Sequence, residues 1–261
     1  MIGVCLKWIP GDERYVQLSF ADQAALELAL SMASVTGDAV QAVTAGPRAA
    51  ENVLRSALAV GVDEVRRIDL DSGTSSAAVA EYLAPALSDC QWIWCGDYSS
   101  DRGSGSVPAF LAGELRYGQA LGLISVDLPS VAGSPLVVRR RLDGGRREVL
   151  EVRGPAVLSV EGSAARLRRA SLRQSMAASK VRIHVNEVDQ VADMADHGSL
   201  RPFRPRPRVV SAPEGRSALE RVRRVTETSS TKGHGEVVEL EPRPAAERIM
   251  SALRQWQYLD Q

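Results

Sequence analysis

The chain has 261 residues, of which 44% are hydrophobic, and this is enough for one large folded domain with or without appendages. Its 32 basic and 32 acidic side chains cancel, so the total charge indicates neither nucleic acid nor a membrane surface as a partner. No apolar run reaches the roughly 18 residues that a membrane span needs, and no membrane insertion is expected. The three cysteines lack CxxC spacing and the three histidines are scattered, so we expect reduced thiols, a cytoplasmic location and no metal site.

Short apolar runs alternate with helical patterns along the first part of the chain. Strands are expected at 2–9, 39–46, 64–70 and 91–96. Helices are expected at 22–37 with Asp22 as N-cap, at 47–62, at 75–89 with a kink or early stop at Pro85, and at 107–115. This alternation is typical of an α/β fold, in which a mostly parallel sheet carries helices on both faces.

The loop that joins the expected strand at 91–96 to the helix at 107–115 is rich in glycine and serine. Ligands of such sheets lie at the carboxyl ends of the strands, where this loop begins. Glycine permits close backbone approach, and the N–H groups at a helix start favour an anion. The pattern matches neither common phosphate-binding signature, so phosphate binding and an ordinary strand–helix connection remain equally good interpretations.

The pattern changes after residue 116. Strand-like runs within 135–160 flank Asp143-Gly144-Gly145, which predicts a β-hairpin. Residues 162–186 include six basic side chains and no acidic one, which indicates a contact surface for an acidic partner. The same stretch has no aromatic residue, which argues against nucleic acid.

The last quarter of the chain differs from the rest. The Pro- and Arg-rich stretch 201–216 is expected to be extended, and 244–259 is expected to form an amphipathic helix. An apolar helix face left in water is costly. We therefore expect a folded domain over 1–195 and an extended arm over 196–261 that docks on a partner subunit.

Taken together, several stretches resemble the beta subunit of electron transfer flavoproteins. They occur in the order and spacing of that family: VCLKWIP at 4–10, SFADQAALELAL at 19–30, AVTAGP followed by LRSALAVGVDEV within 42–65, GDYSSDRGSGSVPAFLAGEL at 96–115, LDGGRREVLEVRGPAVLSV at 142–160 and RRASLRQSMAASK at 168–180. Each stretch alone is weak, but six in order make the resemblance specific.

The resemblance implies an adenine-nucleotide alpha-hydrolase-like fold and an electron carrier subunit without substrate chemistry or catalytic residues of its own. It implies a heterodimer with an electron transfer flavoprotein alpha subunit, which holds most of an FAD. Electrons would come from a partner dehydrogenase and pass to a downstream quinone-linked acceptor. A pocket in this chain would hold AMP or a second FAD.

The resemblance also assigns residues to two sites. The residues implied for the nucleotide pocket are Cys5, Ser19, Ala45, Gly46, Gly96, Asp101, Gly103, Ser104, Gly105, Ser106 and Val107. A recognition loop near 163–180 would meet the dehydrogenase through Arg169, Ala170, Ser171 and the anchor Leu172, although Leu172 also fits ordinary helix packing. Departures from the family pattern, Tyr98 among them, leave the nucleotide open: AMP, FAD or none.

The main alternative is a stand-alone adenine-nucleotide-binding protein of the universal-stress type. It would share the parallel sheet and the glycine-serine loop. It would not need the arm at 196–261, and it would be stable alone or as a homodimer.

Overall fold

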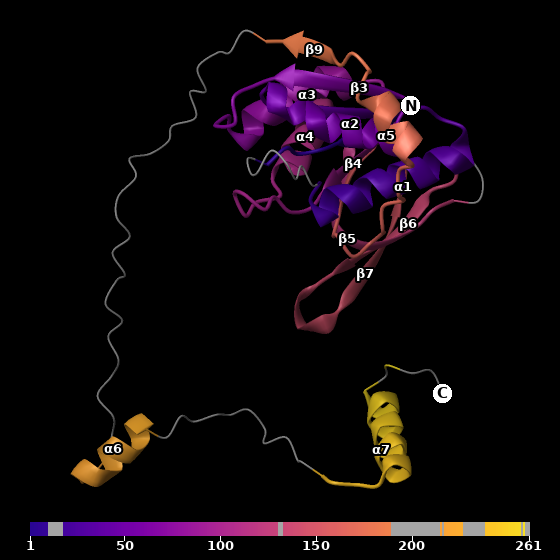
Figure 1. The fold of residues 1–261 in the computed structure, drawn as a ribbon. Helices are drawn as coiled ribbons and strands as arrows, with labels where there is room; N and C mark the ends of the chain where they lie inside the picture. Colours follow the sequence, from indigo (N-terminus) through magenta and orange to yellow (C-terminus); the bar gives the residue numbers. More distant parts are fainter. Residues whose placement is uncertain are drawn as a thin grey trace. The chain divides into compact units, whose positions relative to one another are not determined.

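The computed structural model describes residues 1–9, 18–129, 133–188, 215, 217–226, 238–256 and 258 (Figure 1). The chain divides into two units, Met1–Gly198 and Ser199–Gln261. In the parts of the chain that are described, no helix combines the length and the apolar character needed to cross a membrane.

The described part of the first unit is built on one nine-stranded sheet in the order β7-β6-β5-β8-β4-β1-β2-β3-β9. Only β6 runs antiparallel to its neighbours, β5 and β7, and every other adjacent pair is parallel. This confirms the expected α/β fold with a mostly parallel sheet. The strands are β1 (Ile2–Cys5), β2 (Val40–Ala45), β3 (Glu64–Asp69), β4 (Trp92–Gly96), β5 (Gly118–Asp127), β6 (Leu136–Arg141), β7 (Arg147–Val152), β8 (Ala156–Val160) and β9 (His184–Glu187).

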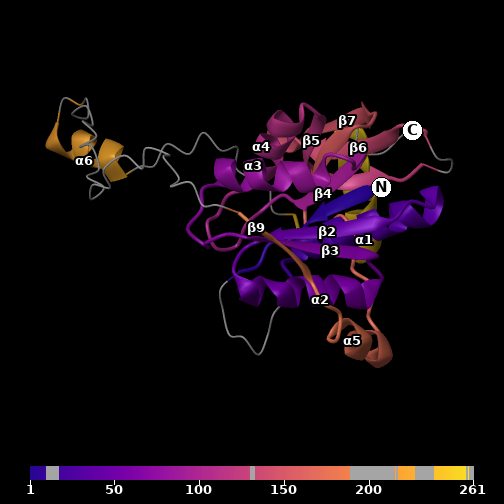
Figure 2. The ribbon, with the colours of Figure 1, turned by 90° about the horizontal axis from the view of Figure 1, so that it is seen from above.

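Helices cover both faces of the sheet, as Figures 1 and 2 show. One hydrophobic core joins the sheet to α1 and α2, and a second core joins the opposite face to α3 and α4. The central strands read as apolar runs because both of their faces are buried. The helices of this unit are α1 (Phe20–Thr36), α2 (Glu51–Val60) after the 3-10 turn η1 (Arg48–Ala50), α3 (Ser76–Leu87), α4 (Val107–Leu115) and α5 (Leu172–Ala178).

The predicted hairpin is present and joins β6 to β7. Its turn is the short 3-10 element η2 (Asp143–Gly145), in which Gly144 and Gly145 have φ values of +71° and +77°. Left-handed backbone of this kind favours glycine. The Asp-Gly-Gly signal therefore predicted the turn for the correct physical reason.

Several expected boundaries need correction. Ser19, not Asp22, caps α1: its Oγ accepts the Asp22 N–H at 3.0 Å, so the helix begins two residues before the expected start. α3 continues past Pro85 and ends at Leu87, two residues before the expected end at 89. The expected strand at 2–9 ends at Cys5.

Two helices of the second unit are described, α6 (Ala218–Thr226) and α7 (Pro242–Gln255). The second corresponds to the helix expected at 244–259, and Pro242 occupies its first turn, where a missing N–H costs nothing. Ile249 and Met250 are exposed on it. Of the stretch expected to be extended, 201–216, all but Gly215 lies outside the described residues.

Candidate functional site

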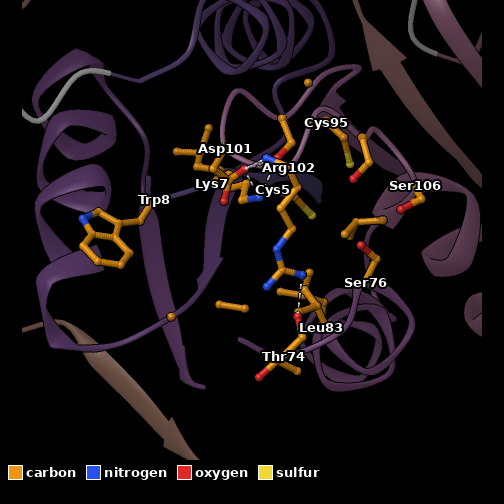
Figure 3. Close-up of a pocket in the computed structure, with 18 of the residues that line it drawn as sticks. Cys5, Lys7, Trp8, Thr74, Ser76, Leu83, Cys95, Asp101, Arg102 and Ser106 are labelled. Atoms are coloured by element: carbon orange, nitrogen blue, oxygen red, sulfur yellow. Dashed lines mark hydrogen bonds and ion pairs between the residues drawn. The ribbon is translucent and has the colours of Figure 1, made fainter. Parts of the chain in front are cut away.

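A cavity of about 330 Å³ opens at the carboxyl ends of β1, β2 and β4 (Figure 3). Cavities of that size are typical of small-molecule sites. β1 lies between β2 and β4, so the sheet order reverses beside it. Ligands of open α/β sheets bind at such a switch point. Nine of the eleven expected pocket residues line the cavity, namely Cys5, Ala45, Gly46, Gly96, Asp101, Ser104, Gly105, Ser106 and Val107.

The loop between β4 and α4 folds back on itself along one side of the cavity. The Ser99 N–H donates to the Ser104 carbonyl at 2.9 Å, and the Gly103 N–H donates to the Ser99 carbonyl at 2.8 Å. A Cβ at Gly105 would lie 1.7 Å from the Asp97 carbonyl oxygen, so no other residue fits there without moving the loop. The close approach explains why this loop needs a glycine, which the sequence pattern alone left open.

The same loop leads directly into α4, so the first N–H groups of that helix lie at the edge of the cavity. Ser106 precedes the helix, and its hydroxyl makes no capping hydrogen bond. Figure 3 places this hydroxyl on the cavity wall. Pro108 has no N–H, and the N–H groups of Ala109 and Phe110 donate to the Ser106 carbonyl. The Val107 N–H is therefore the helix-start donor that can favour an anion. Hydroxyl and N–H donors therefore gather at one end of the cavity.

Lys7 crosses from the end of β1 to this loop. Its Nζ donates to Ser99 Oγ and to Asp101 Oδ1, each at 2.6 Å. Partial burial acts to raise the pKa of Asp101, but the hydrogen bonds from Lys7 and Ser99 outweigh it and hold that pKa at about 2. Asp101 is therefore ionised near neutral pH, and Lys7 and Asp101 offset each other's charge.

Arg102 supplies a positive charge to the cavity. Its guanidinium reaches across to the loop between β3 and α3, where it donates to the carbonyls of Ser72 at 2.6 Å and Thr74 at 2.9 Å. Both acceptors are uncharged, and among the described residues no carboxylate forms an ion pair with Arg102. Because Lys7 is already paired, Arg102 is the cation best placed to attract an anionic ligand.

Asp22 lies against the inner wall and is only 5% exposed. Its Oδ2 accepts the Lys7 N–H at 3.2 Å, and a second backbone hydrogen bond comes from Gly96. Burial is the largest influence and raises the pKa of Asp22 to about 6, although these hydrogen bonds act in the opposite direction. A Cβ at Gly96 would lie 2.6 Å from Asp22 Oδ1, so glycine lets the strand end approach the carboxyl group.

Two of the expected pocket residues do not line the cavity. Ser19 caps α1 and bonds the N–H of Asp22, so it acts on the wall from behind. Gly103 has a φ of +65° and shapes the loop from outside. Ser19 therefore affects the cavity through Asp22, and Gly103 affects it through the loop residues beside it.

Sequence reasoning missed Lys7, Asp22 and Arg102, and it missed the whole loop between β3 and α3. That loop contributes Asp71, Ser72, Thr74 and Ser76 to the cavity. A usable signal was present, because DSGTSS at 71–76 follows a strand and every parallel strand ends at the same edge of the sheet. The long side chains carry no comparable signal, since a lysine or arginine in a loop is usually solvated.

The expected recognition loop forms an exposed surface separate from the cavity lining. Ser171 caps α5, with Gln174 completing a reciprocal capping box. Leu172 is 78% exposed and Met176, one turn later, is 58% exposed. Within the described residues Leu172 is therefore not used for packing, which argues against that alternative. Arg169 is exposed as well, and Ala170 is half-buried.

Comparison with known proteins points in one direction. The model of the electron transfer flavoprotein domain matches residues 12–191. An electron transfer flavoprotein subunit beta of Thermoanaerobacterium thermosaccharolyticum is 31% identical over 142 residues, covering 53% of each chain. Another subunit beta, of Bradyrhizobium diazoefficiens, is 30% identical over 213 residues, covering 80% of this chain and 81% of the relative. Protein FixA of the same organism is 27% identical over 171 residues, covering 62% of this chain and 59% of the relative.

These matches differ in extent. The chain spans only about half of the Thermoanaerobacterium protein and about three fifths of FixA, as the 53% and 59% figures show. The matched residues 12–191 lie within the unit Met1–Gly198 and include the cavity loop and α5.

Proposed function

The chain belongs to the electron transfer flavoprotein family, on its beta-subunit branch, and from this premise we propose that it is the beta subunit of a heterodimeric electron carrier. Its partner is an alpha subunit that holds most of an FAD. The pair takes electrons from a dehydrogenase and passes them to a quinone-linked acceptor in the cytoplasm. The observation that carries the proposal is the family match together with a preformed cavity at the switch point of the sheet.

The cavity is the site of an adenine nucleotide, either AMP or a second FAD. Three features of the described residues support a phosphate at its loop end: the hydroxyls of Ser104 and Ser106, the N–H group of Val107 at the start of α4, and the charge of Arg102. Backbone and hydroxyl donors of this kind bind phosphate strongly. Gly105 lets the backbone come close enough to use them.

FAD supplies the electron transfer when bound, and no residue of this chain needs to move a proton for it. The tasks of the chain are placement and electrostatics. Lys7 and Asp101 fix the glycine-serine loop, while Arg102 ties that loop to the one after β3. The nucleotide therefore enters a cavity whose walls are already held together by hydrogen bonds.

The dehydrogenase docks on α5 and the residues before it. Leu172 is the anchor because it is a large apolar side chain that is 78% exposed at the start of a capped helix. Arg169 and Arg173 flank it and are exposed too. An apolar anchor inside a positive rim fits an acidic partner surface.

Residues 1–195 form the nucleotide-binding domain, and residues 196–261 form an arm that docks on the alpha subunit. In support, Ile249 on α7 and Trp256, which caps the end of that helix, are 59% and 65% exposed. Apolar side chains gathered on one helix are stabilised when a partner covers them.

Co-expression with an electron transfer flavoprotein alpha subunit from the same organism tests the proposal. We expect a yellow 1:1 complex from the pair, and a colourless, poorly soluble product from this chain alone. A colourless chain that is well behaved alone and ignores the alpha subunit would contradict the proposal. If that chain also bound AMP as a monomer or homodimer, it would instead be a nucleotide-binding protein of the universal-stress type.

A further inference from the structure

Two cysteines lie side by side in the wall of the cavity. Cys5 ends β1 and is the direct register partner of Cys95 on the adjacent parallel strand β4. Both side chains pack on the face of the sheet that α3 and α4 cover, and both line the cavity. Figure 3 shows their sulfur atoms among the residues that line it. Nothing in the nucleotide site as argued above requires a thiol at either position.

The spacing of the two residues suits a disulfide. Neighbouring strands lie about 4.7–4.9 Å apart, within the roughly 4.4–6.8 Å between Cα atoms that disulfides span. Cys5 is also the first cause of the raised pKa of Cys95, which fits two thiols that are direct neighbours in the register. Both residues stand at the ends of their strands, where a small shift can bring the Cβ atoms together.

The two thiols differ in their surroundings, and this difference sets the order of reaction. Cys5 is half-buried and open to the cavity, while Cys95 is only 3% exposed. The hydrogen bond to Cys5, followed by burial, raises the pKa of Cys95 well above its usual range. An oxidising disulfide that enters the cavity therefore reacts with Cys5 first, and Cys95 is the thiol that then attacks the mixed disulfide formed on Cys5.

The third cysteine is a natural comparison. Cys90 is 1% exposed and lies beside Gly3 and Leu87, away from the residues that line the cavity. Burial raises its pKa to about 11. Cys90 does not line the cavity through which the oxidant reaches Cys5, so it should stay unreactive under conditions that oxidise the pair.

We propose that Cys5 and Cys95 are a redox-active thiol pair, which a low-molecular-weight disulfide oxidises to an intramolecular disulfide in the cavity wall. The Cys5 thiolate attacks the oxidant and releases one small thiol, leaving a mixed disulfide. Cys95 then loses its proton and attacks the Cys5 sulfur, which releases the second small thiol. The two protein thiols give up two electrons, and the oxidant gains two electrons and two protons.

The bridge would change the cavity that the nucleotide enters. Drawing the two sulfur atoms together pulls the ends of β1 and β4 toward each other; Gly96 comes directly after Cys95, and Lys7 comes two residues after Cys5. Lys7 and Gly96 hold Asp22 and the glycine-serine loop in place. Oxidation therefore weakens nucleotide binding, a consequence that rests on the proposed function, whereas formation of the bridge does not.

The test uses the co-purified complex of the full chain and the aromatic disulfide 5,5′-dithiobis(2-nitrobenzoic acid), whose released thiol is coloured. A matched complex in which this chain carries C5S and C95S gives the background from the partner. After subtraction, we expect two coloured thiols released for each chain and none retained. Peptide mapping should show Cys5 joined to Cys95 with Cys90 free, and dithiothreitol should reverse the change.

The variants separate the two steps. With Cys95→Ser, one coloured thiol should be released and one should remain attached to Cys5. With Cys90→Ser, the count should stay at two. Retention of the aromatic thiol on Cys5 in the unaltered chain, or a bridge that includes Cys90, would overturn the proposal. Because mapping of the unaltered chain decides this, the proposal stays testable even if the Cys95 variant fails to fold.

Binding of AMP is measured before oxidation, after it, and after reduction. We expect AMP binding to be lost and then regained. A bridge that forms while AMP affinity stays constant would refute the coupling to the cavity. If the reduced complex binds neither AMP nor FAD in this cavity, the proposed nucleotide site fails, while the thiol pair is still judged by the mapping.

Discussion

The buried carboxyl group of Asp22 makes the stability of the fold depend on pH in an unusual direction. Its pKa in the folded chain is about 6 instead of the ordinary 3.8, mainly because the group is buried. Each pKa unit corresponds to about 1.4 kcal/mol, so the shift is worth about 3 kcal/mol. The folded state holds this proton more tightly than the unfolded state, so stability falls as pH rises from about 4 to about 6 and is level above that.

Replacing Asp22 with Asn isolates this effect. The amide is uncharged at every pH and resembles the protonated acid in shape and in its acceptor oxygen. The variant should therefore match the unaltered chain near pH 4 and exceed it by about 3 kcal/mol near pH 7. Asp101 does not interfere, because its pKa of about 2 places its titration below this window.

Urea unfolding of the co-purified complex, followed by tryptophan fluorescence at several pH values, measures the difference between the complex with the variant and the complex with the unaltered chain. The difference should grow as pH rises through the window. A difference that is constant with pH would mean that Asp22 is not buried as a neutral acid. A gain of the unaltered chain over the variant with rising pH would reverse the assigned sign and refute the reasoning.

Two further predictions concern the cavity loop and the recognition surface. Gly105→Ala should abolish nucleotide retention, because its Cβ would meet the Asp97 carbonyl at 1.7 Å. Gly103→Ala meets no such contact and should lower the free energy of unfolding by only about 1 kcal/mol, because of its left-handed φ. Thermal unfolding and nucleotide content measure the two effects, and equal behaviour of the two variants would contradict this account. Leu172→Ala should slow flavin reduction by the dehydrogenase in stopped-flow experiments without loss of flavin, while the exposed apolar control Val149→Ala should not. Flavin loss from the first variant would mean that the loop is misplaced.

The parallel core of the fold was predictable because the strand and the helix of each βα unit show their own hydrophobic pattern in the local sequence. β5 and β9 were not predicted. β5 contains Gly118 and Gly122, the latter with a φ of +69°, and its register with β8 shifts, so it lacks a clean strand pattern. β9 is a short strand of polar composition, HVNE. Its pairing with β3 depends on tertiary contact and not on local preference.

The candidate site was predicted in part for a similar reason. Glycines and serines after a strand leave a local signal, and the loop before α4 was found in this way. The roles of Lys7 and Arg102 depend on which loops the fold brings together, at separations of 94 and 28 residues. Asp22 has the residue type of a helix cap and was assigned as one, but Ser19 takes that place and leaves the carboxyl group to the cavity wall. The Ser-x-x-Asp spacing at 19–22 is a capping-box signal that would have favoured Ser19 as the cap.

Mass identification of the nucleotides released from the purified heterodimer is the most direct test of the account. We expect one FAD for each pair of subunits, together with one AMP or a second FAD from the cavity in this chain. The cavity nucleotide should disappear with Gly105→Ala while the first FAD remains. A heterodimer that releases no flavin, or one whose nucleotide content is the same with and without Gly105→Ala, would contradict the account.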